Sequence, residues 1–185
     1  MIKIRQIMKK KRCKWVTDDE IYIKYHDEEW CLPKHDDQEI FELLVLESFQ
    51  SGLSWLTILK KRENFRKAFD NFDYEKIAEY DDDKIDELLS DEGIIRNKAK
   101  INATINNAKV FMDIQEEFGS FDDYIWDFTD GEIIKAEYET ESDLSKKIAK
   151  DLKKRGMKFV GPKTVYSFLE SIGIIDNHEK KCFRY

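Results

Sequence analysis

The sequence has few of the residues that build tight turns: two prolines and seven glycines among 185 residues. Sandwiches and barrels need such residues at many turns, so their scarcity favours helices joined by short connections. No repeat, low-complexity segment or linker divides the chain, whose length suits one sizeable domain. We therefore expect an all-α fold with a single helical domain over residues 12–185, preceded by a basic leader of residues 1–11.

Cysteine is also scarce, with three residues far apart in the chain. An odd, scattered set does not describe a disulfide framework, so reduced thiols or metal ligands fit better. No apolar run approaches the length of a membrane span, and the basic leader has no apolar core of the kind that a signal peptide needs. We expect a soluble, cytoplasmic protein with no membrane partner.

The net charge of −7 at first argues against a nucleic-acid partner, but the charges are unevenly distributed. Residues 73–92 contain ten acidic side chains, whereas residues 146–163 contain eight basic ones and a single aspartate. The second stretch can bind phosphate even though the whole chain is acidic.

One carboxylate is predicted to face the core. Glu47 lies on the apolar face of a helix that starts after Asp36 and runs to about Phe49, in three- and four-residue register with Ile40, Leu43 and Leu44. A lone carboxylate there needs a partner, a raised pKa or a function. Gly52 then permits a turn to a second helix opening at Trp55, so a carboxylate and an aromatic ring would meet in a pocket for a flat polar ring. The alternative is a half-buried Glu47 paired with a lysine.

Hydrophobic spacing and capping residues predict the remaining elements. The expected helices cover residues 19–26, 55–69, a short stretch of the acidic segment stopped by Gly93, a long helix from about Asn97, 142–155 and 162–172. Residues 120–128 are expected to form a short aromatic helix or a turn. Residues 129–140 are expected to form a loop.

The turn at residues 156–164 joins two of these helices within the basic stretch. Backbone N–H groups at a helix start, with lysines beside them, suit a DNA phosphate. The candidate DNA contacts are Lys158, Gly161, Lys163 and Thr164. The alternative is a helix connection on a solvated basic face.

His178 and Cys182 lie four residues apart near the C-terminus, a spacing that allows both to bind one metal ion. Cys13 and His26 could complete a tetrahedral Cys2His2 zinc site that joins the two ends of the chain. Alternatively, Cys13 is a buried thiol and His178 a surface residue. Cys31 and His35 are spare candidates, which we interpret as structural or exposed.

Five aromatic residues form a further candidate group: Trp15, Tyr22, Tyr25, Trp30 and Trp55. Aromatic residues at helical spacing belong more often to a core than to a binding site. Tyrosine hydroxyls near a core-facing carboxylate need hydrogen-bond partners, however, and this favours a binding site.

Taken together and in order, several blocks resemble the DNA-3-methyladenine glycosylase I family of the helix-hairpin-helix glycosylases. The blocks are residues 12–15, 22–30, 47–55, 59–64, 93–96 and 159–161, followed by His178 and Cys182. The resemblance implies a bacterial base-excision repair enzyme, acting on double-stranded DNA with alkylated adenine. Such an enzyme hydrolyses the N-glycosidic bond of 3-methyladenine, releasing the free base and leaving an abasic site. We also expect a monomer.

By position, the resemblance assigns one structural Zn²⁺ to Cys13, His26, His178 and Cys182. Glu47 matches the carboxylate that binds the lesion base, and we expect it to be ionised and to read the adenine edge. Tyr25 and Trp55 match ring-stacking positions, and the remaining pocket positions are Trp15, Tyr22 and Trp30. The lesion is already a cationic leaving group, so the family needs no general acid, and the base is flipped into its slot.

The sequence departs from the family pattern at a few positions. Phe159 stands where many hairpins of the superfamily have their first glycine, and Phe49 lies close to Glu47. Asp176 falls near the position of the superfamily's catalytic aspartate, but we expect it to bond backbone near the zinc site. Two other functions stay open: a non-catalytic, zinc-stabilised DNA-binding module, and a glycosylase of shifted lesion specificity.

Overall fold

The computed structural model describes residues 10–137 and 139–185, so the predicted leader lies outside the described residues except for Lys10 and Lys11. The helices are α1 (Glu20–Glu28), α2 (Asp37–Gln50), α3 (Trp55–Ala68), the 3-10 turn η1 (Asp70–Phe72), α4 (Tyr74–Ala78), α5 (Asp82–Ser90), α6 (Lys98–Phe118), α7 (Phe121–Asp127), α8 (Asp143–Arg155) and α9 (Pro162–Ser171). None of these helices is long and apolar enough to cross a bilayer. The prediction of one mostly helical domain is confirmed.

The helices begin where short polar side chains can accept the first free backbone N–H groups. Asp36 accepts from the N–H of Glu39 at 2.8 Å, and Ser54 accepts from that of Thr57 at 3.2 Å. Asn97 and Ser142 cap α6 and α8 in the same way. The acidic segment differs from the prediction, because it forms two helices, and the second ends at Ser90 rather than at Gly93.

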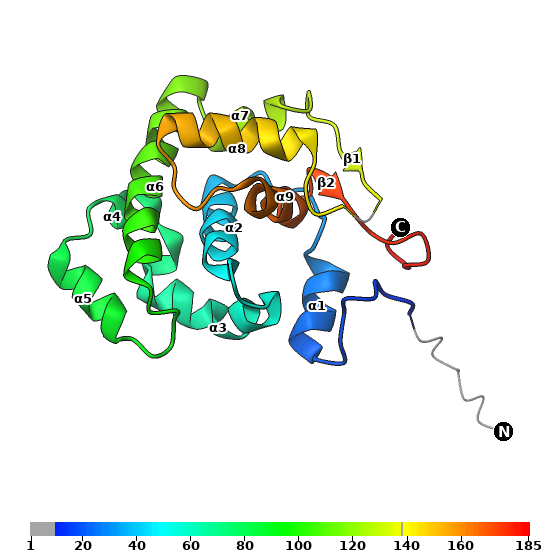
Figure 1. The fold of residues 1–185 in the computed structure, drawn as a ribbon, viewed down its shortest axis with the longest axis horizontal. Coiled ribbons are helices and arrows are strands. Elements are labelled where there is room, and N and C mark those ends of the chain that lie inside the picture. Colours follow the sequence, from blue (N-terminus) through cyan, green and yellow to red (C-terminus); the bar gives the residue numbers. More distant parts are fainter. Residues whose placement is uncertain (1–9, 138) are drawn as a thin grey trace.

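Helix α2 forms the centre of the molecule (Figure 1). Every residue from position 40 to 49 is buried, and the helix packs against α3, α6, α7 and α9. Helix α8 packs on α9, while α4 and α5 pack on α6. Because α2 is covered on all sides, any polar side chain on it must find a partner or face a cavity.

One strand of a short pair lies within residues 129–140, which the sequence predicted to form a loop. Strand β1 (Ile134–Lys135) pairs in parallel with β2 (Ile175–Asp176), directly after α9. The N–H of Ile134 donates to the carbonyl of Ile174 at 2.8 Å, and that of Ala136 to the carbonyl of Asp176 at 2.9 Å. A two-residue pair has too little side-chain alternation to be seen in sequence. It holds Ala136 beside Asp176, five residues after the end of α9 at Ser171.

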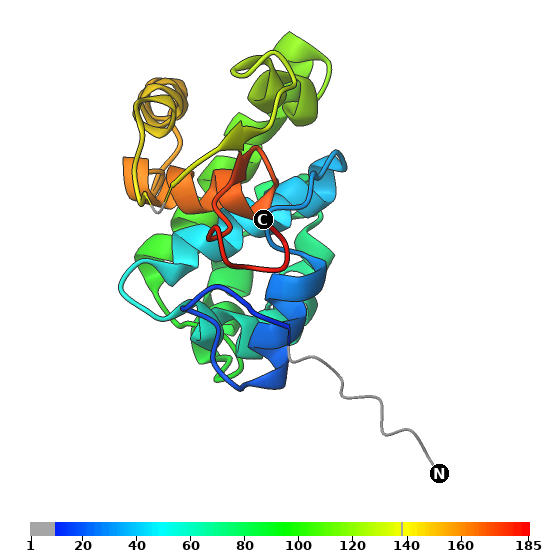
Figure 2. The same cartoon turned by 90° about the vertical axis from the view of Figure 1, so that its right-hand side faces the viewer.

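The first and last described segments lie side by side (Figures 1 and 2). The N–H of Phe183 donates to the carbonyl of Lys11 at 2.8 Å, and the N–H of Lys14 donates to the Glu179 carboxylate at 2.7 Å. These bonds bring the candidate zinc ligands of the two chain ends into one region.

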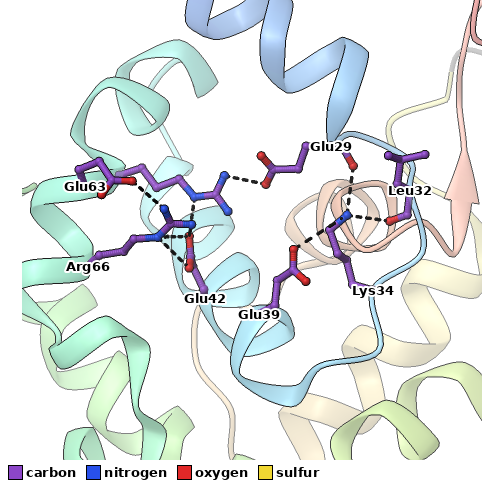
Figure 3. Close-up of polar contacts among 8 residues, drawn as sticks. Glu29, Leu32, Lys34, Glu39, Glu42, Glu63 and Arg66 are labelled. Carbon is purple, nitrogen blue, oxygen red and sulfur yellow. Dashed lines mark hydrogen bonds and ion pairs between the residues drawn. The ribbon is translucent and has the colours of Figure 1, made fainter.

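Helix α1 is tied to α2 and α3 by an ion-pair group, which we call the Glu42 cluster (Figure 3). The buried Glu42 carboxylate accepts hydrogen bonds from the guanidinium groups of Arg62 and Arg66 on α3. Arg62 also donates to Glu29, directly after α1, at 2.6 Å, and Arg66 pairs with Glu63 at 2.6 Å. Arg62 therefore joins α1 to α2 and fixes the wall that α1 contributes to the site described next.

Candidate functional site

A pocket of about 270 Å³ opens between α1, α2, α3 and α9. This volume lies near the lower end of the range for small-molecule sites, which starts at roughly 300 Å³. Its lining includes the whole set that the sequence placed at a base-binding site: Trp15, Tyr22, Tyr25, Trp30, Glu47 and Trp55. Four separate stretches of the chain thus meet at one concave surface.

The aromatic rings contact each other edge to face or at a tilt, the arrangements that ring quadrupoles favour. Trp15 lies with its ring centroid 4.9 Å from those of both Tyr22 and Trp30. Tyr25, buried on α1, lies 5.5 Å from Trp55 at the start of α3. The aromatic walls are therefore held by one another, and a flat ring is the shape that such walls accept.

The elbow between α2 and α3 is held by a residue that sequence reasoning missed. Gly52 adopts a φ of 85°, a conformation that side chains with a Cβ disfavour. Lys100, buried on α6, donates from Nζ to the carbonyls of Phe49 and Ser51, both at 2.8 Å. These bonds satisfy carbonyls at the end of α2 and hold the turn that leads to Trp55.

Glu47 is 4% exposed and lines the pocket from α2. Within residues 10–137 and 139–185, no side chain gives its carboxyl group a hydrogen bond or an ion pair, so the lysine partner of the alternative interpretation is not found there. Burial, and secondarily the nearby Glu170, hold the pKa of Glu47 well above its usual value. The ionised Glu47 expected from the sequence stays a prediction: burial opposes its charge, and no basic side chain of the described residues lines the pocket to compensate it.

Further lining residues come from segments that sequence reasoning did not assign to the site. They are Gln50, Glu139, Thr140, Ser167, Glu170, Asn177 and Glu179. The available signal was Glu170, a carboxylate next to Leu169 on the apolar last helix. All four charged residues of the lining are glutamates, and no lysine, arginine or histidine of the described chain lines the pocket. The pocket is thus suited to an uncharged or positively charged ring.

Beside the pocket, the two ends of the chain form a cluster of thiol and imidazole groups. Metal-binding atoms of Cys13, His26 and Cys182 all lie within 4.8 Å of one another, and all three residues are buried. Cys182 Sγ lies 3.4 Å from His26 Nε2. Ligands around a tetrahedral zinc ion with bonds of 2.0–2.3 Å stand about 3.5 Å apart, so this spacing fits.

His178 provides the fourth candidate ligand. Its ring lies 5.3 Å from that of His26, and its Nε2 is buried without a hydrogen-bond partner among the described residues. Each imidazole has its Nδ1 beside a carboxylate, His26 at 2.9 Å from Asp27 and His178 at 2.7 Å from Asp176. A carboxylate on Nδ1 leaves Nε2 as the nitrogen with a lone pair, as in histidines that bind metal.

The protonation states of the thiol and imidazole groups also affect metal binding. Burial lowers the pKa of both His26 and His178, which favours the neutral imidazole that a metal requires. Burial raises the pKa of the Cys13 thiol to about 12, and a divalent cation would reverse that preference. A second group of potential ligands, Cys31, Asp176 and His178, also lies within 4.8 Å.

Cys31 and His35 do not act together. Cys31 is buried, whereas His35 is exposed and lies 3.0 Å from Asp122. Asp176 accepts a hydrogen bond from the backbone N–H of His178 at 3.1 Å, the type of contact expected from the sequence. Asp176 is absent from the pocket lining and faces the candidate metal cluster instead.

The predicted DNA contacts lie on the turn between α8 and α9 and in the first turn of α9, and none of them lines the pocket. Lys158 and Lys163 are exposed, and Gly161 caps α9. Asn107 on α6 holds the turn, accepting from the N–H of Lys158 at 2.8 Å and donating to its carbonyl at 2.9 Å. A Cβ at Gly161 would meet nothing within 4 Å, so the fold itself does not require glycine there.

Phe159 lies in the same turn with a φ of 57°. This left-handed conformation is uncommon for a bulky residue and explains why glycine is the usual choice at such a position. The ring is 39% exposed at the tip of the turn. The backbone therefore keeps the shape of the turn despite the substitution.

Comparison with known proteins agrees with this site. A family model for methyladenine glycosylase matches residues 15–185. The DNA-3-methyladenine glycosylase of Haemophilus influenzae is 42% identical over 177 residues, covering 92% of this chain and 96% of that protein. DNA-3-methyladenine glycosylase 1 of Escherichia coli is 40% identical over 180 residues, covering 94% and 96%.

Solved structures agree as well. A crystal structure of a 3-methyladenine DNA glycosylase I aligns with a TM-score of 0.90 at 42% identity, covering 94% of this chain and 98% of that chain. A variant of such an enzyme in complex with 3-methyladenine aligns at 0.89 and 39% identity, covering 93% and 96%. The chain belongs to the methyladenine glycosylase family.

The isolated Glu47 predicts a pH dependence of stability. Between its usual pKa of 4.5 and its raised folded pKa, the native state keeps a proton that the unfolded chain has lost. The free energy of unfolding of the ligand-free protein should therefore fall across this interval as the pH rises. Glu47→Gln removes this contribution, so the stability of the variant relative to wild type should increase with pH.

Urea unfolding of both proteins at mildly acidic and mildly alkaline pH measures this difference. Glu132→Gln, at an exposed glutamate, controls for the change in net charge. A Glu47→Gln difference that is independent of pH would show that Glu47 titrates normally.

Proposed function

We propose that this protein is a base-excision repair glycosylase that hydrolyses the N-glycosidic bond of 3-methyladenine in alkylated double-stranded DNA. The products are the free base and an abasic site. The observation that carries the proposal is a buried Glu47 that has no hydrogen-bond or ion-pair partner among the described residues, in an aromatic pocket that none of their basic side chains lines. A relative with the same fold has been crystallised with 3-methyladenine, and two relatives that cover more than 90% of this chain are DNA-3-methyladenine glycosylases.

The pocket accounts for recognition of a flipped base. Tyr25 and Trp55 offer faces on which a purine ring can stack, and the Glu47 carboxyl group can accept a hydrogen bond from the exocyclic amine. An N3-methylated adenine attached to the sugar carries a positive charge. Placed beside Glu47, this charge favours the ionised carboxylate that burial alone opposes.

Bond cleavage then requires little from the protein. The electron pair of the C1′–N9 bond moves onto the purine, which becomes neutral, and a water molecule adds to C1′ of the sugar with loss of a proton. Because the base leaves readily, no general acid is needed. The role of Glu47 is to bind the base edge.

Release of free base from methylated DNA, resolved by chromatography, tests this function. Wild-type protein should release 3-methyladenine, whereas folded Glu47→Gln should release it roughly ten- to a hundredfold more slowly. The expected loss corresponds to one charge-assisted hydrogen bond, about 1.5–3 kcal/mol. If the wild-type protein binds DNA but releases no base, the protein is a binding module; release of a different base would indicate shifted specificity.

We also propose one structural zinc ion, bound by Cys13, His26, His178 and Cys182. Support comes from the ligand spacing, the orphaned Nε2 of His178 and the carboxylates that orient both imidazoles. The ion would join the two chain ends behind Trp15 and Trp30, whose rings contact the histidines. Its contribution is a cross-link within the fold.

Cys182→Ala should lose the zinc and become less stable by several kcal/mol, since structural zinc contributes on the order of 10 kcal/mol in small folds. The rate of the chemical step in the remaining folded protein should change much less. Cys31→Ala is the matched control, a second buried thiol outside the proposed set, and should keep the metal. Metal analysis and thermal unfolding of the natively purified wild type and both variants measure these effects. Zinc lost from Cys31→Ala alone would assign it to the group of Cys31, Asp176 and His178.

We further propose that the α8–α9 turn is a helix-hairpin-helix element that binds a DNA phosphate through Lys158, Gly161, Lys163 and Thr164. The open space at Gly161 supports close approach of a ligand backbone, and the basic side chains of the turn are exposed.

Lys163→Glu should weaken binding to undamaged duplex DNA several-fold at low salt, because one phosphate contact becomes a repulsion. The slope of log affinity against log salt should decrease by about one. Lys76→Glu, in the acidic segment, makes the same charge change as a control. Equal binding of Lys163→Glu and wild type at low salt would exclude the turn as the DNA contact.

A further inference from the structure

Glu170 is a second carboxyl group in the pocket. It lies near the end of α9 and lines the same cavity as Glu47 on α2. The side chain is partly exposed, so the cavity reaches it. Asn177 donates from Nδ2 to one carboxyl oxygen of Glu170 at 2.8 Å. Among the described residues, the second oxygen has no hydrogen bond to another side chain and remains available to a ligand.

The other two glutamates of the lining are placed differently. Glu179 already accepts a hydrogen bond from the N–H of Lys14 at 2.7 Å, and Glu139 is exposed to solvent. Among the described residues, the Glu47 carboxyl group has no side-chain hydrogen bond and Glu170 has one oxygen held by Asn177, so these two are the carboxyl groups best placed to contact a ligand in the pocket.

The electrostatics of the pair point to a cationic ligand. Burial raises the pKa of Glu170 to about 8, although the hydrogen bond from Asn177 opposes this rise, and Glu170 in turn raises the pKa of Glu47. Two carboxyl groups that disfavour each other's ionisation can both ionise when a positive charge lies between them. The Glu42 cluster shows the contrast, because there the protein itself supplies two guanidinium groups.

We propose that Glu170 is a second lesion-binding residue, which together with Glu47 selects a positively charged, N-alkylated purine over neutral bases. This inference rests on the proposed glycosylase function and adds a residue that determines its specificity. Asn177 holds one oxygen of the Glu170 carboxyl group, and Glu170 lines the cavity.

The charge on the base exists only while the glycosidic bond is intact. Cleavage moves the bond's electron pair onto the purine and removes the positive charge. The attraction to Glu170 therefore acts on capture of the lesion and disappears in the product. A neutral adenine flipped into the pocket would face two carboxyl groups without offering a charge, and would bind less well.

Glu170→Gln tests the proposal, because it removes the charge but keeps the shape and an oxygen that can accept from Asn177. Calorimetric titration uses two probes in mildly alkaline buffer: 3,9-dimethyladeninium, a permanent cation that mimics the sugar-linked lesion, and uncharged 3-methyladenine. Glu170→Gln should bind the cation about tenfold or more weakly, the scale of a charge-assisted hydrogen bond, and the neutral base within about twofold of wild type. Glu132→Gln should bind both probes as wild type does.

Kinetics on methylated DNA provide a second readout. For Glu170→Gln, the KM for lesion-containing DNA should rise about tenfold, while the single-turnover rate at saturating protein stays within about threefold of wild type. Equal weakening of both probes, or no weakening of the cation, would overturn the role of Glu170. A wild-type protein that releases no base would instead refute the proposed function, so the two failures are distinguishable.

Discussion

The structure depends on the complete burial of α2, which carries two carboxyl groups into the interior. Glu42 meets two arginines of α3, and these connect it to the end of α1. Glu47, less than two turns later on the same helix, meets no cation in the described chain. Glu42 thus holds the helices together, whereas the Glu47 carboxyl group has no such partner and can bind a ligand. The contrast defines the pocket as a place for a ligand that brings its own donors or charge.

Helix α1 is the wall of the pocket that most needs support, because it packs chiefly on α3 rather than into the main core. Arg62 ties its C-terminal end to α2 through Glu29. On its other side, His26 enters the cluster of thiols and imidazoles formed by both chain ends. Tyr22 and Tyr25, which line the pocket, lie on the same helix as His26 and just before Glu29. Zinc, if bound as proposed, would make the second attachment far stronger.

The pocket and the α8–α9 turn lie on connected elements, since α9 starts in the turn and ends beside Glu170. Asn107 fixes the turn to α6, and Lys100 on the same helix fixes the elbow before Trp55. A phosphate bound at the turn and a base bound in the pocket would therefore be held by one rigid framework. Such positioning is what extraction of a single base from a duplex requires.

The sequence by itself determined the helices, because hydrophobic spacing and caps such as Asp36, Ser54 and Ser142 act over a few residues. It also identified Glu47, the aromatic set and the four candidate zinc ligands, since carboxylates on apolar faces and paired thiols and imidazoles stand out locally. The sequence stretches that contain these residues also resemble those of a known family.

Only the tertiary structure decided the features that depend on contacts between segments distant in the sequence. No single segment of the chain predicts the β1–β2 pair, the meeting of Glu139 and Glu170 at one pocket, or the hydrogen bonds of Lys100 to the turn between α2 and α3. The raised pKa of Glu47 belongs to the same class. Whether a buried carboxyl group is charged depends on the absence of a cation across the pocket, and that absence is a property of several elements packed together.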